Sequence, residues 1–202
     1  MNEAILVIFQ LVILILSVMI HEVSHGFVAY LLGDNTARDA KRLNLNPLNH
    51  LDWFGSVILP LLLYVTTSGA FVIGWAKPVP YNPFNLKNPK TGAGLIAAAG
   101  PLSNFLLALL VSLFLKFSGI NGIINPIFLQ ITVLLNLSLM VFNLVPIPPL
   151  DGSKILFALL PSKWFKFQFV LERYGIWFLI IFIFFGFSLI VPIIGVLYRL
   201  LV

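Results

Sequence analysis

Long uncharged stretches dominate the chain and predict helices that cross a membrane. The first runs from residue 4 to residue 20 without a charged side chain, and apolar sequence resumes after residue 26. About 20 apolar residues are enough to cross the hydrocarbon core of a bilayer, so we expect an all-α polytopic membrane protein with about four to six transmembrane segments. Four later stretches also lack Asp, Glu, Lys and Arg: residues 53–76, 91–115, 117–150 and 174–198.

The composition agrees with a multi-pass protein of the cell membrane. Hydrophobic residues make up 60% of the chain and charged residues only 9%, with a mean hydropathy of +1.04. Ordinary soluble domains carry about 25% charged residues. The net charge of +5 comes from few and scattered basic residues, so we expect the lipid bilayer as a partner and no nucleic acid.

The amino terminus and the chain as a whole show few signs of processing or division. The first residues carry Glu3 and no Lys or Arg, and the apolar run that follows is longer than the core of a signal peptide. Both features disfavour a cleaved signal peptide. We find no internal repeat and no linker long enough to separate domains. We therefore expect residues 1–202 to form a single membrane-embedded domain.

Three ionisable side chains interrupt the first apolar segment, in the sequence His21-Glu22-Val23-Ser24-His25. Polar side chains at membrane depth are costly and indicate function by default. Histidines at positions i and i+4 share one helical face, about 6 Å apart along the axis. Both imidazoles can therefore reach one zinc ion (Zn2+), with Glu22 beside the water that the metal activates. This segment predicts a metalloprotease built within a membrane.

Zinc needs a further ligand, and the chain has no cysteine to supply it. Asp151 stands out among the seven acidic residues because it ends the uncharged run 117–150, in the sequence Pro146-Ile-Pro-Pro-Leu-Asp151-Gly152. The prolines stop a regular helix just before the carboxylate. Such a sequence alone more often forms a turn with a capping aspartate. Beside a histidine pair at membrane depth, it favours a metal ligand.

A single active site requires its parts to lie at one depth, and this requirement predicts the topology. The histidines, the start of the 91–115 helix and Asp151 meet on one side only if segment 53–76 begins and ends on that side. We therefore predict a re-entrant hairpin there, or two short helices broken near residues 66–69, since irregular backbone is allowed at depth when protein surrounds it.

The distribution of basic residues gives the orientation independently. Ten lie on the predicted active-site side and two on the other. Positive charge gathers in cytoplasmic loops, so we expect the active site toward the cytoplasm and the N-terminus outside. The ten are Arg38, Lys41, Arg42, Lys77, Lys87, Lys90, Lys154, Lys163, Lys166 and Arg173; the two are Lys116 and Arg199.

Three motifs together resemble the site-2 protease family, in its compact prokaryotic group without PDZ or CBS domains. They are His21-Glu22-x-x-His25, Gly100-Pro101-x-x-Asn104 and Asn143-x-x-Pro146-x-x-Pro149-Leu150-Asp151-Gly152. The resemblance covers nearly the whole chain and extends to segments 42–52 and 74–80. It implies that His21, His25 and Asp151 bind zinc and that Glu22 activates water. It also implies an intramembrane zinc metalloendopeptidase that cleaves transmembrane protein substrates within or near their helices, in regulated proteolysis or in clearance of signal-peptide remnants.

Substrate binding calls for further polar groups. Asn104 and Asn143 are candidates to bind the oxyanion or an unwound substrate backbone, with helix packing as the alternative, favoured for Asn143. Segment 42–52 is a candidate for a short membrane-edge β strand, and this edge or the return segment 74–80 is a candidate to pair with unwound substrate. An ordinary interfacial loop is the favoured alternative. We expect His50 to be solvated at the interface and leave it outside the metal set.

Two functions of other classes compete with a protease. A metal or proton transporter would use the histidines and acids as an ion path, but segments 53–76 and 174–198 supply no charged residue for it. A non-catalytic membrane scaffold is disfavoured because every predicted reactive residue is present.

Overall fold

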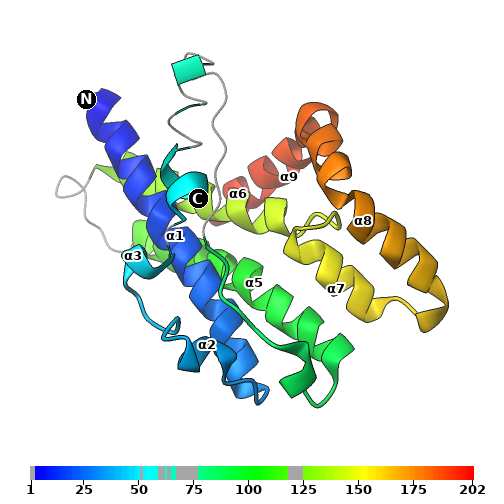
Figure 1. Ribbon diagram of the computed structural model, residues 1–202. Coiled ribbons are helices and arrows are strands. Elements are labelled where there is room, and N and C mark those ends of the chain that lie inside the picture. Colours follow the sequence, from blue (N-terminus) through cyan, green and yellow to red (C-terminus); the bar gives the residue numbers. More distant parts are fainter. Residues whose placement is uncertain (1–2, 51, 59–61, 63–64, 67–76, 118–124) are drawn as a thin grey trace.

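The computed structural model describes residues 3–50, 52–58, 62, 65–66, 77–117 and 125–202, and these residues form helices and connecting turns without a β strand (Figure 1). The all-α prediction is therefore confirmed. The helices are α1 (Glu3–Leu31), α2 (Thr36–Asp39), α3 (Pro47–His50), η1 (Trp53–Ile58), η2 (Pro83–Asn85), α5 (Pro89–Phe117), α6 (Pro126–Asn143), α7 (Asp151–Leu159), η3 (Ser162–Trp164), α8 (Phe165–Ile181), η4 (Phe182–Gly186) and α9 (Phe187–Leu201).

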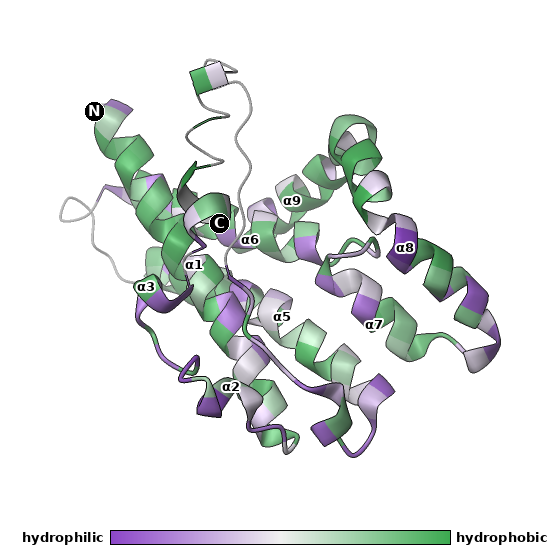
Figure 2. Cartoon of the chain, in the orientation of Figure 1, coloured by the Kyte–Doolittle hydropathy of each residue, from purple (hydrophilic) through white to green (hydrophobic). Residues whose placement is uncertain are grey.

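Four helical stretches in the described part of the chain are long and apolar enough to cross a membrane. This number lies at the lower end of the predicted range and agrees with a multi-pass membrane protein. Figure 2 shows apolar residues along the first half of α1 and along α9, and hydrophilic residues around α2 and the turn between α7 and α8. The four stretches are Glu3–Leu31, Pro89–Phe117, Pro126–Asn143 and Ser162–Leu201.

Helix α5 is the centre of the fold, because α1, α6 and α7 all pack against it. Its first half is rich in glycine and alanine, which lets neighbouring backbones approach closely. A Cβ atom at Gly94, for example, would lie 2.5 Å from the Ala158 Cβ in α7. On the other half of the bundle, α9 closes the core by packing Ile190 and Ile194 against Val133 and Leu137 of α6.

The break between α6 and α7 places Asp151 at the first position of α7. Helix α6 begins after Asn125, whose side chain accepts a hydrogen bond from the Ile127 N–H at 3.1 Å. It ends at Asn143, and prolines fill the turns that follow. A Cβ atom at Gly152 would overlap the backbone of Leu144 and Val145. Glycine therefore allows the start of α7 to lie directly against the end of α6.

The C-terminal span differs from the predicted uncharged helix at 174–198. The helical region begins earlier, at Phe165, and the π-helical turn η4 separates α8 from α9. Figure 1 shows α8 and α9 meeting at a sharp angle. A straight helix of the 40 residues Ser162–Leu201 would be about 60 Å long, twice the hydrocarbon thickness. The widened π-helical turn supplies the bend.

The edge-strand candidate in segment 42–52 is wrong for the residues that the structure describes there, which are all except residue 51, and the favoured alternative without a strand agrees with them. They form turns and α3. The asparagine side chains bond the nearby backbone: Asn44 Oδ1 accepts from the Asn46 N–H at 2.9 Å, and Asn46 Oδ1 from the Leu48 N–H at 3.1 Å. Such local bonds favour turns over strand pairing.

The two ends of the predicted re-entrant segment lie together. The Lys77 N–H donates a hydrogen bond to the His50 carbonyl at 2.9 Å, as a segment that begins and ends on one side requires. Residues 59–61, 63–64 and 67–76 lie outside the described residues. They include residues 74–76 of the second segment that was proposed to pair with substrate. The path of the hairpin therefore stays a prediction, and residues 77–80 are irregular.

Candidate metal centre

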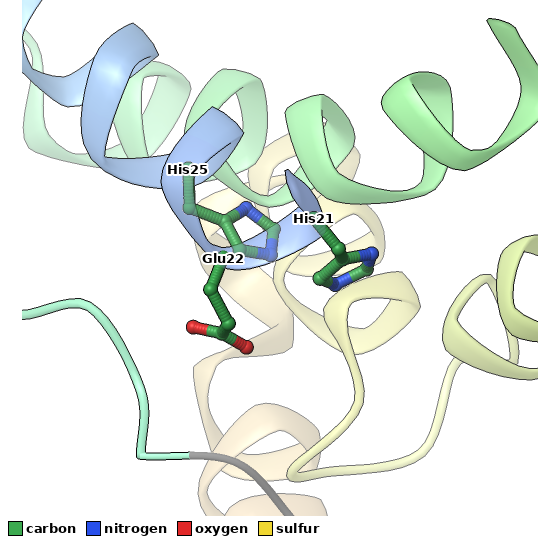
Figure 3. A group of neighbouring side chains, drawn as sticks. All are labelled: His21, Glu22 and His25. Atoms are coloured by element: carbon green, nitrogen blue, oxygen red, sulfur yellow. The ribbon is translucent and has the colours of Figure 1, made fainter. Parts of the chain in front are cut away.

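His21 and His25 project from the second half of α1, one helical turn apart (Figure 3). Their ring centroids lie 4.6 Å apart and the rings are nearly perpendicular, at 88°. The side chains are 7% and 12% exposed, so both imidazoles are held inside the protein. The i, i+4 spacing has therefore brought the two rings to one place, as the sequence predicted.

Asp151 reaches both imidazoles from the first position of α7. Its Oδ2 atom lies 3.1 Å from His21 Nε2 and 3.2 Å from His25 Nε2. The carboxylate side chain is only 10% exposed. Thus the structure assembles the three predicted ligands from α1 and α7, whose residues are far apart in the sequence.

Hydrogen bonds at the far side of each ring fix which nitrogen faces Asp151 as an acceptor. His25 Nδ1 lies 2.6 Å from the Ile96 carbonyl, which can only accept, so Nδ1 carries the proton. His21 Nδ1 lies 2.6 Å from Asn104 Oδ1. In the neutral form of each ring, Nε2 would then hold a lone pair that faces the carboxylate, as in metal-binding histidines.

This donor set fits zinc. In that neutral form all three atoms would hold lone pairs, and a cation between them would offset their mutual repulsion. With bonds of 2.0–2.1 Å, two ligand atoms of a tetrahedral zinc site are about 3.3 Å apart. The two Nε2–Oδ2 distances, 3.1 and 3.2 Å, are close to that value.

Glu22 lies beside the histidines but is held by a different part of the chain. Its Oε2 atom accepts a hydrogen bond from the Val79 N–H at 3.0 Å. The ligand atoms of His21, Glu22 and His25 all lie within 4.8 Å of one another. One turn further along α1, a Cβ atom at Gly26 would lie 2.6 Å from the Val79 side chain. The missing side chain lets the segment that carries Val79 approach Glu22.

A buried carboxylate anchors that segment at its other end. Asp34 is fully buried and accepts hydrogen bonds from the Asn82 N–H at 2.6 Å and the Asn85 amide at 2.7 Å. It also accepts from the Thr36 hydroxyl at 2.5 Å and the Thr36 N–H at 3.1 Å. Burial raises the pKa of Asp34, but these hydrogen bonds outweigh it and hold the pKa below its usual value.

A chain of buried polar side chains supports His21 from behind. Asn104 donates to Asn136 Oδ1 at 3.0 Å and to the Ser17 carbonyl at 3.4 Å, and Asn136 donates to Ser17 Oγ at 3.0 Å. Asn104 and Asn136 are fully buried. Ser17 and Asn136 were not among the predicted site residues. The signal for them was their polarity within otherwise apolar spans.

The backbone of α5 forms one wall of the centre at Gly100. A Cβ atom there would lie 2.5 Å from the Cε1 and Nε2 atoms of His21 and 2.5 Å from His25 Nε2. Glycine is therefore the residue that leaves room for both rings. The sequence showed the Gly-Pro pair without showing what it faces.

The other sequence candidates have different surroundings. Both ends of the Asn104 amide are bonded inside the protein, so in this structure it supports His21 instead of facing substrate. Asn143 donates to the Leu139 carbonyl of its own helix at 3.0 Å, and its oxyanion role stays a prediction. The expectation of a solvated His50 is wrong, since it is 2% exposed, with Nε2 2.9 Å from the Asn44 carbonyl.

Comparisons with known proteins agree with this geometry. A family model described as Peptidase family M50 matches residues 9–127 and 118–186. YwhC of Bacillus subtilis is 36% identical over 87% of this chain and 80% of its own length. MJ0392 of Methanocaldococcus jannaschii is 28% identical over 81% of this chain and 38% of its own length. Rip2 of Mycobacterium tuberculosis is 32% identical over 78% of this chain and 62% of its own length. All three have "zinc metalloprotease" in their names. No solved structure gives a significant match.

Proposed function

The chain belongs to peptidase family M50, and we propose that the side chains gathered at the end of α1 and the start of α7 are its catalytic zinc centre. It is a zinc-dependent protease with a polytopic membrane fold. In our proposal, His21, His25 and Asp151 hold the metal. The observation that carries this assignment is the position of Asp151 Oδ2, within 3.2 Å of both Nε2 atoms.

Glu22 acts as the general base and then as the general acid. Zinc, when bound, polarises the peptide carbonyl and lowers the pKa of water. Val79 fixes Oε2 of Glu22, so we assign the proton to the other oxygen, Oε1. The carboxylate takes the proton from the attacking water and passes it to the leaving amine. Asn104 keeps the proton of His21 on Nδ1, and Ile96 does the same for His25.

The substrates that we propose are transmembrane proteins, cleaved within or near their helices. The active site faces the cytoplasm and the N-terminus lies outside. The basic residues support this orientation, with ten on one side and two on the other. The Ser112 hydroxyl donates to the Leu201 carbonyl, so the ends of α5 and α9 that carry the two outer basic residues lie together. We also propose that the described helices form one domain. Nothing in the comparisons supports the transporter or scaffold alternatives.

Substitution of Glu22 by glutamine tests the assignment. We expect cleavage of a model transmembrane substrate to fall by about 10²–10⁴-fold, the usual contribution of a general base, while the zinc content stays at the parent value. His21→Ala and Asp151→Asn should lower the zinc content itself. Glu3→Gln, at the exposed start of α1, is the matched control. Parent-rate cleavage by Glu22→Gln would remove Glu22 from the mechanism.

A further inference from the structure

A cavity of about 410 Å³, whose lining includes none of the proposed metal ligands, lies between the first turn of α5, the helix α7 and the helix α8. Charged side chains of both signs line it: Lys90 on α5, Lys154 on α7 and Glu172 on α8. We propose that this cavity binds the headgroup of a membrane phospholipid, with the phosphate at the two lysines and a hydrogen-bond donor of the headgroup at Glu172. This proposal does not depend on the catalytic assignment.

Lys154 supplies the main argument for a bound anion. Its side chain is half-buried, and its ammonium lies 5.8 Å from the centroid of the Tyr81 ring, which also lines the cavity. Among the described residues no carboxylate forms an ion pair with it, and the segments outside them contain no Asp or Glu. A half-buried lysine whose ammonium lies beside an aromatic ring and has no carboxylate partner favours an anionic ligand.

Lys90 is held at the same cavity. Its ammonium donates to the carbonyl of Leu160, the residue that follows α7. An ammonium has three donors, so two are left for a ligand. A phosphate diester has enough acceptor oxygens to meet both lysines, and the start of α5 adds favourable positive potential.

The side chains that α8 contributes to the cavity, Gln168 and Glu172, explain why the ligand needs a hydrogen-bond donor as well as a phosphate. Gln168 donates to Glu172 Oε1 at 3.1 Å, which orients the carboxylate. A phosphate has no donor for Glu172, so the ligand needs a second group that can donate to it. The ammonium of phosphatidylethanolamine, or the hydroxyls of phosphatidylglycerol, would donate to it. The choline group of phosphatidylcholine has no such donor.

The surroundings of the cavity suit the headgroup level of a bilayer. The candidate span Ser162–Leu201 begins beside it. Large aromatic side chains are exposed at this end of the span: Trp164 at 47%, Phe165 at 68% and Phe169 at 53%. Aromatic residues concentrate at the membrane interface, and basic pockets between transmembrane helices bind lipid headgroups there.

Native mass spectrometry of the purified chain tests the proposal. The chain would be incubated in detergent with equal amounts of phosphatidylethanolamine, phosphatidylglycerol and phosphatidylcholine, and the retained lipid would be counted. We expect the parent to retain the first two in preference to phosphatidylcholine. Lys154→Gln should weaken retention by about tenfold, the value of a charge-assisted hydrogen bond. Glu172→Gln should remove the preference over phosphatidylcholine. Lys163→Gln, exposed and outside the cavity lining, is the control for general attraction to lipid.

Several outcomes would overturn the proposal. Equal retention of all three lipids by the parent would exclude headgroup recognition, and this comparison decides even if Lys154→Gln fails to fold. Displacement of the retained lipid by excess inorganic phosphate would assign the cavity to a free anion. Parent-like lipid retention in Lys154→Gln, combined with weaker cleavage of a model substrate, would assign it to the substrate peptide.

Because lipid retention is measured without proteolysis, Glu22→Gln should retain lipid as the parent does.

Discussion

Replacing Gly100 by alanine is the sharpest test of the metal centre, because this change adds one methyl group where the structure has no room for it. The added Cβ atom would lie 2.5 Å from Nε2 of both His21 and His25. Ordinary van der Waals contact begins at 3.4 Å, so the backbone and the rings must separate by about 0.9 Å. Neither ring can move freely, because the Nδ1 atoms lie 2.6 Å from Asn104 Oδ1 and from the Ile96 carbonyl.

This displacement is several times larger than a zinc site tolerates. Metal–ligand bond lengths stay within about 0.2 Å of their usual values. We therefore expect zinc affinity to fall by about 10–100-fold, and proteolysis to fall with it. The free energy of unfolding should decrease by about 1–3 kcal/mol, as for other overpacked sites.

The assay is a zinc competition titration of the purified chain against a chromophoric chelator. The matched control is Gly195→Ala in α9, because a Cβ atom at Gly195 has no neighbour within 4 Å among the atoms described. The control should bind zinc as the parent does. If Gly100→Ala binds zinc within about twofold of the parent affinity, the rings are not confined by α5 and the reasoning is wrong.

Three further predictions concern the supports of the centre. Asn136→Leu breaks the hydrogen bonds to Asn104 and Ser17, and should weaken zinc binding by about tenfold in the same titration, with Gly195→Ala again as control. Asp34→Asn should lower the free energy of unfolding by about 1–3 kcal/mol near neutral pH. Because the pKa of Asp34 is lowered in the folded protein, the Asp34 carboxylate stabilises the fold above its usual pKa, and this stabilisation is lost as the pH falls through the folded pKa. The difference in melting temperature between parent and variant should therefore become smaller in acid. Zinc removal by a chelator should lower the melting temperature of the parent but not that of His21→Ala.

The residues that sequence analysis located were those whose polarity is exceptional for their position. His21, Glu22, His25 and Asp151 carry ionisable groups in or beside apolar runs, and the structure brings all four together. The helices were predicted from the same pattern, because a long uncharged run indicates a membrane-spanning helix and its length independently of how the helix packs.

Several roles and elements that the sequence left open or did not indicate depend on how the chain packs. Whether Asn104 faces substrate or His21 is set by how α5 lies against α1 and α6, and one sequence does not contain that rotation. The role of Gly100 is likewise visible only once two helices are placed side by side. The edge strand failed for a local reason, because Asn44 and Asn46 bond the nearby backbone. The bend at Phe182–Gly186 has no charge or proline to announce it.

The segment that holds Glu22 is fastened at two points, by Lys77 to the His50 carbonyl and by Asn82 to Asp34. Neither fastening involves a proposed metal ligand. Metal loading and proton transfer are therefore mechanically separate in this fold. A change confined to residues 77–82 would act on Glu22 through its hydrogen bond to the Val79 N–H and would leave the three proposed zinc ligands in place.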